Sequence, residues 1–488
     1  MTPAIVISTI LIYIALLFAV AYISGRRADN QGFFVGNRRS PWWAVMFAMI
    51  GASMSGVTFV SVPGMVAADH FSYLQMSLGF VAGQLVIAFV LVPLFYRMQL
   101  VSIYEYLENR FGTGSYRTGA WFFFISKVLG AAVRIFLVCV ILQMLVFDPL
   151  GLPFALNVAA TMALVWLYTR GGVKSLIWTD SLKTLCLLGS VGLCIWYITR
   201  NLGMDWGSVR QAVLDHPYSR IWFFDNPDDP RYFFKQFFAG LFMVVAMTGL
   251  DQDMMQRSLS CKNTRDSQKN VVIAGTLQLV VIAMFLILGI LLYLFMERNG
   301  IALPAKSDQV FPLVATDASF PLIVGILFVL GLISSTYSAA GSALTALTTS
   351  FTVDILGAQH LPPQRLTRLR KRVHLAMTAV LALVIAAFEL LNDSSVISAV
   401  YTLASYTYGP ILGMFAFGIL TRRKVRDGWV PAAALLSPLL CFVLQRNSQA
   451  WLGGYTFGYE LLIINALFTF IGMWALSTRP AAETETKR

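Results

Sequence analysis

Long apolar runs separated by short charged or turn-forming segments are the dominant pattern along this chain. A helix that crosses a bilayer needs about 20 consecutive apolar residues, and thirteen runs have about that length. The runs cover residues 3–24, 41–66, 75–96, 118–146, 154–169, 175–198, 237–256, 271–296, 321–349, 373–391, 395–419, 428–444 and 459–477. The pattern predicts an all-α polytopic membrane protein with about 13 transmembrane helices.

The composition supports a protein embedded in a lipid bilayer and excludes a soluble one. Of the 488 residues, 57% are hydrophobic and 12% are charged, and the mean hydropathy is +0.70. About a quarter of the residues of soluble domains are charged. The net charge of +12 is spread over short segments, and no basic run is interleaved with aromatic residues, so we expect no nucleic-acid partner.

Lys and Arg are distributed unevenly between the segments that join the runs. If the N-terminus lies outside, the segments on the inner side contain 25 of the 36 Lys and Arg residues. An excess of positive charge is typical of the cytoplasmic side. The distribution predicts an integral protein of the plasma (inner) membrane with an external N-terminus and a cytoplasmic C-terminus.

Residues with catalytic or metal-binding chemistry are scarce and scattered. The five cysteines have no metal-ligand spacing, and the four histidines fall in loops or at the ends of runs. No nucleophile is placed beside a base. We therefore expect neither an enzyme nor a bound cofactor.

Two runs contain small and polar residues at membrane depth. Residues 51–56 read Gly-Ala-Ser-Met-Ser-Gly, and residues 248–253 read Thr-Gly-Leu-Asp-Gln-Asp. A helix interrupted within the membrane exposes backbone polar groups that a binding cavity or neighbouring protein must satisfy. Close packing through small residues is the alternative.

The two interruptions divide the chain into similar halves. Runs two to six and runs seven to eleven each comprise five helices and each open on an interrupted helix, and an odd number of helices inverts the second repeat in the membrane. The predicted units are 1–40, the first helix and a cytoplasmic loop; 41–198, inverted repeat 1; 199–236, an external loop; 237–419, inverted repeat 2; 420–477, two additional helices; and 478–488, the cytoplasmic tail.

Five short motifs occur in a characteristic order between residues 30 and 426. They are Phe-Phe-Val-Gly-Asn-Arg at 33–38, Tyr-Glu-Tyr-Leu-Glu-Asn-Arg-Phe at 104–111, Gly-Gly-Val-Lys-Ser-Leu-Ile-Trp-Thr-Asp at 171–180, Asp-Gln-Asp-Met-Met-Gln-Arg at 251–257 and Phe-Thr-Val-Asp at 351–354. The ordered set resembles the sodium:solute symporter family. This resemblance implies a LeuT-like core of 5+5 helices in inverted repeats, with one extra helix before the core and two after it.

The same resemblance implies that a small organic solute enters the cell together with Na⁺, which acts as the coupling ion. Matching the family's main sodium site to this chain assigns ligand positions to Gly51, Met54, Ser335, Ser338 and Ala339. The first three would provide carbonyl oxygens and Ser338 a hydroxyl. Relatives usually have a second hydroxyl at the position of Ala339, so one sodium ligand is missing here.

Asp180 matches an acidic position that helps some relatives to bind a second sodium ion. Ser338 and Ser342 could supply hydroxyl oxygens to the same site. A carboxylate at membrane depth needs a cation or a proton. Asp180 is therefore a candidate for a second cation or proton site, with an ion pair to Lys183 or Lys127 as the alternative.

Arg134 lies in the middle of the fourth run, where an arginine without a partner is unfavourable unless it faces a cavity. Its forked guanidinium suits carboxylates, which points to an anionic or zwitterionic solute. A structural ion pair with Asp251 or Asp253 is the alternative. The remaining candidates for the solute site are Ser55, Thr58, Phe59, Met247 and Tyr337, of which the last three could equally be packing residues.

Two other functions stay open. The missing hydroxyl at Ala339 leaves room for proton-coupled or uncoupled transport by the same fold. A membrane solute sensor is a third hypothesis, because some relatives carry a fused sensor kinase. The solute, the stoichiometry and the oligomeric state are not determined by the sequence.

Overall fold

The computed structural model describes residues 3–25, 42–98, 100, 102–169, 176–317, 319–358, 361–391 and 396–478. The first half contains α1 (Pro3–Gly25), α3 (Trp42–Ser53), α4 (Gly56–Asp69), α5 (Tyr73–Val86), η2 (Ile87–Leu91), α6 (Val92–Met98), α7 (Glu105–Arg110), α8 (Thr113–Leu142), η3 (Gln143–Phe147), η4 (Asp148–Leu150), α9 (Phe154–Tyr168), α10 (Leu176–Asn201), α11 (Trp206–Leu214) and η7 (Pro217–Ser219).

The second half repeats the alternation of long helices and short turns. It contains α12 (Phe233–Val244), η8 (Val245–Gly249), α13 (Gln252–Ser258), α14 (Thr264–Arg298), η9 (Ser307–Gln309), α15 (Val310–Ala315), α16 (Leu322–Ser350), η10 (Phe351–Ile355), α17 (Pro363–Leu391), α18 (Val396–Leu420), β1 (Lys424–Val425), η12 (Asp427–Trp429), α19 (Val430–Trp451), α20 (Leu461–Ala475) and β2 (Ser477–Thr478). The two short strands pair antiparallel.

The helices lie where the apolar runs predict them, but fewer of them are long enough to cross a membrane than the thirteen predicted. Each of the thirteen predicted runs overlaps a helix or a pair of helices. In the described residues, seven helices are long and apolar enough to cross a membrane, or up to nine if each bent pair is one span. Shorter apolar helices lie in α1, α9 and α20. The prediction of an all-α membrane protein is confirmed, whereas thirteen crossings are not.

Both predicted interruptions are breaks in helices. The segments 45–53 and 56–69 meet at 52°, and the segments 233–249 and 252–258 meet at 75°. The second break follows a π-helical turn, η8, which already departs from α-helical hydrogen bonding. The two breaks therefore expose backbone groups inside the helical bundle.

Small residues bring the helices next to these breaks into close contact. A Cβ atom added at Gly79 of α5 would lie 2.1 Å from the carbonyl oxygen of Phe237 in α12. A Cβ added at Gly240 would lie 2.1 Å from the carbonyl oxygen of Met76. Close approach of this kind is how helices associate where no hydrophobic effect operates between them.

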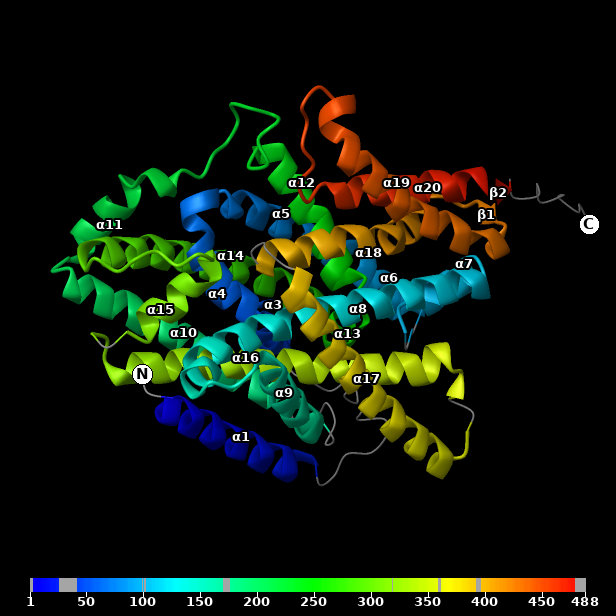
Figure 1. Ribbon diagram of the computed structural model, residues 1–488. Helices are drawn as coiled ribbons and strands as arrows, with labels where there is room; N and C mark the ends of the chain where they lie inside the picture. Colours follow the sequence, from blue (N-terminus) through cyan, green and yellow to red (C-terminus); the bar gives the residue numbers. More distant parts are fainter. Residues whose placement is uncertain are drawn as a thin grey trace, which may run out of the picture.

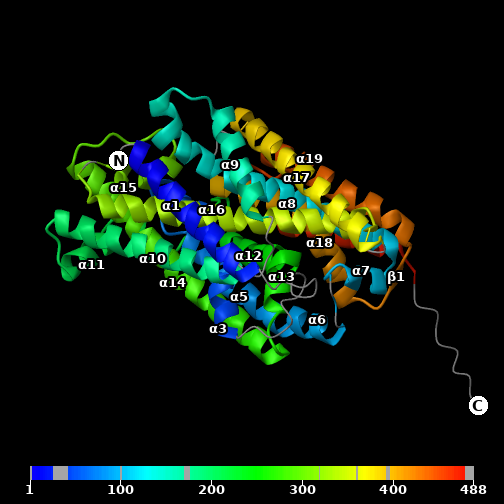
Figure 2. The same ribbon diagram turned by 90° about the horizontal axis from the view of Figure 1, so that it is seen from below.

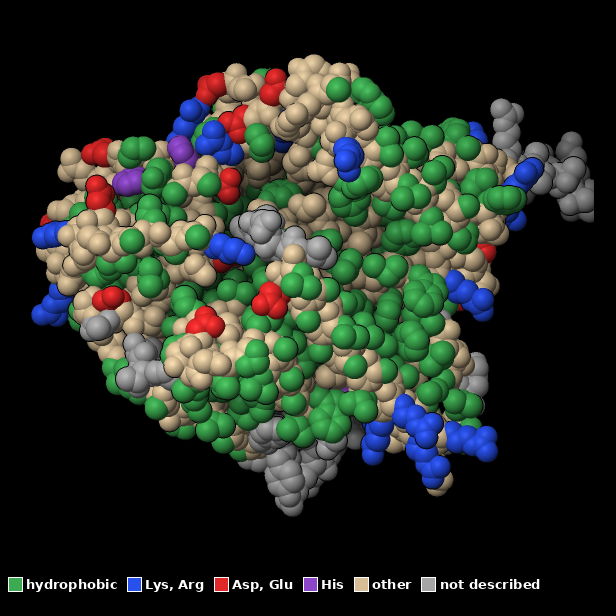
Figure 3. All heavy atoms as spheres, viewed as in Figure 1, with side chains coloured by type: hydrophobic (Ala, Val, Ile, Leu, Met, Phe, Trp, Pro, Cys, Tyr) green, Lys and Arg blue, Asp and Glu red, His purple; other side chains and the backbone are tan. Residues whose placement is uncertain are grey.

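The outer helices flank this central packing. Figure 1 shows α1 at one edge of the molecule and α19 and α20 at the opposite edge, with α4, α8, α12, α16 and α18 between them, and in Figure 2, seen from below, α1 lies in front of the other helices. α1 packs against α16 and α9, whereas α20 packs against α18 and α19. Hydrophobic side chains cover much of the face seen in Figure 3, as expected for a surface in contact with lipid.

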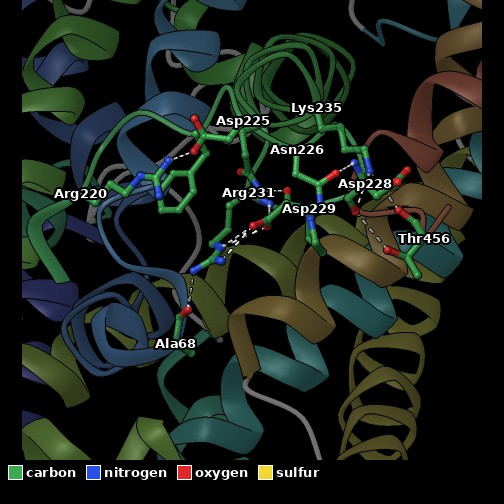
Figure 4. A network of polar contacts seen from close by, with 12 residues as sticks. Ala68, Arg220, Asp225, Asn226, Asp228, Asp229, Arg231, Lys235 and Thr456 are labelled. Atoms are coloured by element: carbon green, nitrogen blue, oxygen red, sulfur yellow. Dashed lines mark hydrogen bonds and ion pairs between the residues drawn. The ribbon is translucent and has the colours of Figure 1, made fainter. Parts of the chain in front are cut away.

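A folded connection between α10 and α12, residues 202–232, ties several helix ends together (Figure 4). Arg231 binds the carboxylate of Asp229 at 2.8 Å and reaches the carbonyl of Ala68 at the end of α4. Lys235 of α12 donates to the carbonyls of Asp228 and Thr456, both at 3.3 Å. The hydrogen bond from Arg231 holds the pKa of Asp229 below its usual range.

Candidate functional site

A cavity lies between the two broken helices. Side chains from α4, α8, η8, α13, α16 and α18 line it. Its lining is apolar on the α12 side and charged where α8 faces α13. This is the place expected of a solute site between two repeats.

A buried ion-pair network forms one wall of the cavity. The ammonium group of Lys127 in α8 lies 3.1 Å from an Asp251 oxygen and 3.3 Å from an Asp253 oxygen. The guanidinium of Arg257 lies 3.6 Å from the second Asp253 oxygen, and the Tyr408 hydroxyl donates to Asp251 at 2.8 Å. Because Lys127 and Asp251 are 8% and 3% exposed, each depends on the other for compensation of its charge.

The position of Asp251 follows from the break in the seventh run. Asp251 is the N-cap of α13, and its carboxylate accepts from the backbone N–H of Met254 at 3.2 Å. The hydroxyl of Tyr104 donates to the carbonyl of Leu250 at 2.9 Å, so a polar side chain also satisfies the other end of the break. The break thus holds a carboxylate at the cavity wall.

Arg134 lines the same cavity about two turns after Lys127, on the same face of α8. Among the residues that the structure describes, the half-buried guanidinium makes neither an ion pair nor a hydrogen bond. Gly130 lies one turn earlier, where an added Cβ would make ordinary van der Waals contact with Arg134 Nη1 at 3.5 Å. Among the described contacts, Lys127 and Arg257 make the ion pairs with Asp251 and Asp253, whereas Arg134 acts on Asp253 electrostatically without forming a close ion pair.

The proposed main sodium ligands gather at the first break. The Ser335 hydroxyl of α16 donates to the carbonyl of Met54 at 3.4 Å, which brings the two helices together at this point. Gly51 is buried one turn before Met54. Ala339 lines the cavity. The side chain of Ser338 is outside the part that the structure describes, so its hydroxyl stays a prediction.

The second cation site is only partly covered by the structure. Asp180 falls within α10, but its side chain is outside the described part, as is that of Lys183. Ser342 lines the cavity and accepts a hydrogen bond from Arg257 at 2.5 Å. The neighbouring guanidinium is unfavourable for a second cation at the Ser342 hydroxyl. The described partners of Lys127 are Asp251 and Asp253, and the alternative pairing of Asp180 with Lys183 or Lys127 lies outside the described part.

Three of the five further solute candidates line the cavity and two do not. Ser55, Thr58 and Met247 are cavity residues. Phe59 is fully buried and stacks on Phe328 with ring centroids 5.4 Å apart. Tyr337 is also buried, at 2% exposure. Phe59 and Tyr337 are therefore better described as packing residues of the core than as solute ligands, because neither lines the cavity.

Sequence reasoning missed the contribution of α18. Tyr401, Thr407 and Tyr408 also line the cavity, and Tyr408 joins the charged wall through its hydrogen bond to Asp251. The Tyr401 hydroxyl shares a 2.6 Å hydrogen bond with that of Tyr73 in α5. The spacing of seven between Tyr401 and Tyr408 places both on one helical face, and this polar stripe in an apolar run was the available signal.

Comparisons with known proteins agree with this architecture. The sequence model of the sodium:solute symporter family matches residues 33–435. The human sodium/iodide cotransporter is 26% identical over 82% of this chain, and the sodium/sialic acid symporter NanT of Aliivibrio fischeri is 26% identical over 84%. The matched regions span 62% of the human protein's length and 82% of the bacterial protein's length.

The fold is shared with solved transporter structures. A Na⁺-coupled sialic acid symporter in a substrate-bound outward-open state superimposes with a TM-score of 0.80, covering 98% of this chain and 99% of that chain at 19% identity. The closed conformation of Mhp1, a nucleobase-cation-symport-1 family transporter, has a TM-score of 0.54 at 12% identity. The LeuT-like fold class is therefore confirmed, and the chain is an integral membrane protein.

Proposed function

Because the chain belongs to the sodium:solute symporter family, we propose that it is a secondary active transporter that couples the entry of a small solute to Na⁺. The observation that carries this proposal is Arg134, a guanidinium in a cavity between two broken helices that makes no hydrogen bond or close ion pair with a described residue. Relatives named for sialic acid, iodide and monocarboxylates transport anions. An anionic or zwitterionic solute is consistent with both facts.

The balance of charges in the cavity supports an anion. Lys127 and Arg257 are compensated by Asp251 and Asp253, with which they pair. Arg134 leaves one positive charge in excess among the described lining residues. A bound carboxylate would supply the missing charge, and Ser55 and Thr58 of α4 would provide polar contacts.

Sodium would bind where the first break meets α16. Carbonyls of Gly51, Met54 and Ser335 and the hydroxyl of Ser338 are the oxygen ligands that we assign, with Ala339 at the position that lacks one. Asp180, with Ser338 and Ser342, remains our candidate for a second cation or a proton.

The orientation in the membrane is also a proposal. The excess of Lys and Arg places the N-terminus outside and the C-terminus in the cytoplasm. In this orientation the connection at residues 202–232 is external, and the basic start of α17 is cytoplasmic.

Coupling to protons is the second candidate function. Two carboxylates of the cavity wall, Asp251 and Asp253, could exchange a proton, and Ala339 weakens the expected sodium site. This alternative predicts uptake that follows a proton gradient and does not require sodium.

The first step of the test is to find a solute. The purified protein is screened by thermal unfolding against sialic acid, pyruvate and iodide, each with sodium or with choline, because a ligand of the folded state raises the unfolding midpoint. Uptake of the solute that raises the midpoint most is then measured in proteoliposomes under a sodium gradient or a proton gradient. Uptake that needs sodium supports the proposal, and uptake that follows only the proton gradient favours the alternative.

The second step tests Arg134. Arg134→Gln should weaken solute binding about 10- to 100-fold, since a hydrogen-bonded charge contact is lost. Arg200→Gln is the matched control, because Arg200 is exposed at the end of α10 over the ring of Trp196. Equal affinities of the two variants would contradict the role of Arg134.

A further inference from the structure

Aromatic side chains form a continuous surface patch where the connection between α10 and α12 joins α12. The aromatic patch comprises Trp222, Phe224, Phe234 and Phe238, which are exposed, and the half-buried Phe233, which joins them. The exposed fractions are 50% and 51% for the first two and 49% and 44% for the next two. None of the five lines the central cavity. The solute site therefore does not account for the aromatic patch.

The rings of the aromatic patch contact one another all the way from the connection to α12. The ring centroid of Phe224 lies 4.8 Å from that of Phe233 and 6.2 Å from that of Phe234. Trp222 stacks on Phe224 at 6.2 Å, and Phe234 stacks on Phe238 at 6.4 Å. Pairs of rings at these separations attract each other. A contiguous apolar surface of this kind marks a place of interaction, whereas scattered exposed side chains do not.

The backbone of the connection directs Trp222 and Phe224 outward. Phe223, which lies between them, is buried, and its N–H donates to Gln75 Oε1 of α5 at 3.1 Å. Its carbonyl accepts from the N–H of Phe233 at 2.8 Å. Side chains alternate between the two sides of an extended segment. Because Phe223 is held inward, both flanking rings are held at the surface.

The aromatic patch continues onto a face of α12 that meets the bilayer. α12 belongs to a broken span of an integral membrane protein. Phe234 and Phe238 are four residues apart and share one helical face. Gly240 lies on the buried side of the helix, where it packs against Met76 of α5. The exposed face of α12 is therefore in contact with lipid, and the rings of the connection extend the same surface.

Polar side chains border the aromatic patch on the connection. Asp225 and Asn226 follow Phe224 directly and are exposed. Arg220, at the other end of the aromatic segment, pairs with Asp225 (Figure 4). Tryptophan is enriched at the boundary between hydrocarbon and headgroups, because its ring is apolar and its N–H is polar. Trp222 beside this charged border has the surroundings of that boundary.

We propose that the aromatic patch lies in the interfacial region of the lipid bilayer, with its α12 rings against the acyl chains and Trp222 and Phe224 at the level of the headgroups. The connection is then a membrane-surface anchor, and this holds for either orientation of the chain. Its backbone also holds the turn between α4 and α5, because the N–H of Phe71 donates to the carbonyl of Arg220 at 3.1 Å. The bilayer thereby helps to fix the C-terminal end of the broken helix α4.

The test uses a nitroxide spin label on single cysteines in the cysteine-free full chain, reconstituted in phosphatidylcholine vesicles. Trp222→Cys and Phe224→Cys report on the aromatic patch, and Phe238→Cys is the reference on α12. Asn226→Cys is the matched control, because Asn226 is exposed two residues after Phe224 and outside the aromatic patch. Collisions of each label with oxygen, which concentrates in the bilayer, are compared with collisions with a water-soluble nickel chelate.

The ratio of oxygen to nickel collisions at positions 222 and 224 should be several-fold higher than at position 226 and close to that at position 238. Ratios at 222 and 224 equal to the ratio at 226 would show that the connection lies in water and overturn the proposal. Few collisions with either reagent would show that protein, such as a second copy of this chain, covers the aromatic patch, and would also overturn it.

A second measurement keeps the native rings and cysteines. The fluorescence of the wild type and of Trp222→Phe is compared in vesicles with and without phosphatidylcholine brominated close to the headgroup. The difference between the two proteins is the fluorescence of Trp222, and brominated lipid should quench most of it. If brominated lipid leaves this difference unchanged, Trp222 does not contact lipid and the proposal is wrong.

Discussion

Lys127 shows how one buried charge depends on residues far away in the chain. It lies in α8 and binds carboxylates that a helix break more than a hundred residues later presents. Removing one partner of a buried ion pair leaves an uncompensated charge, which destabilises a protein by about 3–5 kcal/mol.

Lys127→Met should therefore lower the thermal unfolding midpoint of the purified protein markedly. Asp251→Asn in addition should restore part of the loss, because Asp253 keeps its contact with Arg257 and the Asn oxygen can still accept from Tyr408. Both variants are compared with the wild type by scanning fluorimetry in the same detergent. A midpoint of Lys127→Met equal to that of the wild type would show that the pair contributes little to stability.

Ala339 is the position at which we propose that the sodium site of this chain lacks one ligand. Ala339→Ser would add one hydroxyl beside a desolvated cation, and a ligand of this kind contributes about 1–3 kcal/mol. Half-maximal uptake should then need roughly tenfold less sodium. The measurement is uptake against sodium concentration at fixed pH, with Ala340→Ser as the control, because Ala340 is the next residue of the same cavity-lining helix. A similar sodium requirement in both variants would place the site elsewhere.

At the scale of helices, the contact between α5 and α12 depends on glycine. Gly79→Ala would put a Cβ atom 2.1 Å from a backbone oxygen of α12, so the two helices must move apart. We expect a clear drop in the unfolding midpoint and in the yield of monodisperse protein.

Gly189 of α10 is the matched control for this prediction. No atom lies within 4 Å of an added Cβ there, so Gly189→Ala should be neutral or stabilising by up to about 1 kcal/mol, the helix preference of Ala over Gly. A similar loss of stability in both variants would show that close packing at Gly79 is not the cause.

The turn between α4 and α5 carries a histidine under two constraints. His70 has a positive φ of 56°, and its buried Nδ1 has no hydrogen-bond partner among the residues that the structure describes. Burial, followed by the charges of Arg231 and Arg220, lowers the pKa of His70 from its usual value, while Asp229 acts in the opposite direction. Protonation therefore favours the unfolded state more than the folded state.

Stability should accordingly fall as the pH drops below about 6.5, the pKa of an unperturbed histidine. His70→Asn removes the titrating group and keeps a residue that tolerates positive φ. The fall in unfolding midpoint between pH 8 and pH 5 should be smaller in this variant. His216, whose pKa burial also lowers, accounts for part of the remaining fall. Identical pH profiles of wild type and variant would assign the effect to other groups.

At the scale of the whole molecule, the inverted repeat predicts which surfaces face outward. In a cysteine-free background, a cysteine at Asn226, in the connection between α10 and α12, should react with a membrane-impermeant maleimide in intact cells. A cysteine at Arg368, in the basic start of α17, should react only after permeabilisation. Both positions are exposed in the fold, so access depends on the side of the membrane. The opposite labelling pattern would reverse the proposed orientation.

The sequence by itself determined the features that depend on local composition. A bilayer requires long apolar helices, so each long apolar helix is visible as a hydrophobic segment, and both breaks are marked by small and polar residues in such a segment. The ordered motifs also identified the family. The sequence also predicts four residues that line the cavity: Arg134, because its charge lies at membrane depth, and the solute candidates Ser55, Thr58 and Met247.

Only the tertiary structure decided which of these groups meet. The partners of Lys127, the contribution of Tyr401 and Tyr408, and the turning of Phe59 and Tyr337 into the core depend on how each helix is rotated about its axis and on which helix packs beside it. In an almost uniformly apolar helix, hydrophobic periodicity does not specify that rotation, because lipid and protein interior are equally apolar. The rotation is specified by contacts such as Gly79 against Phe237, between residues distant in the chain.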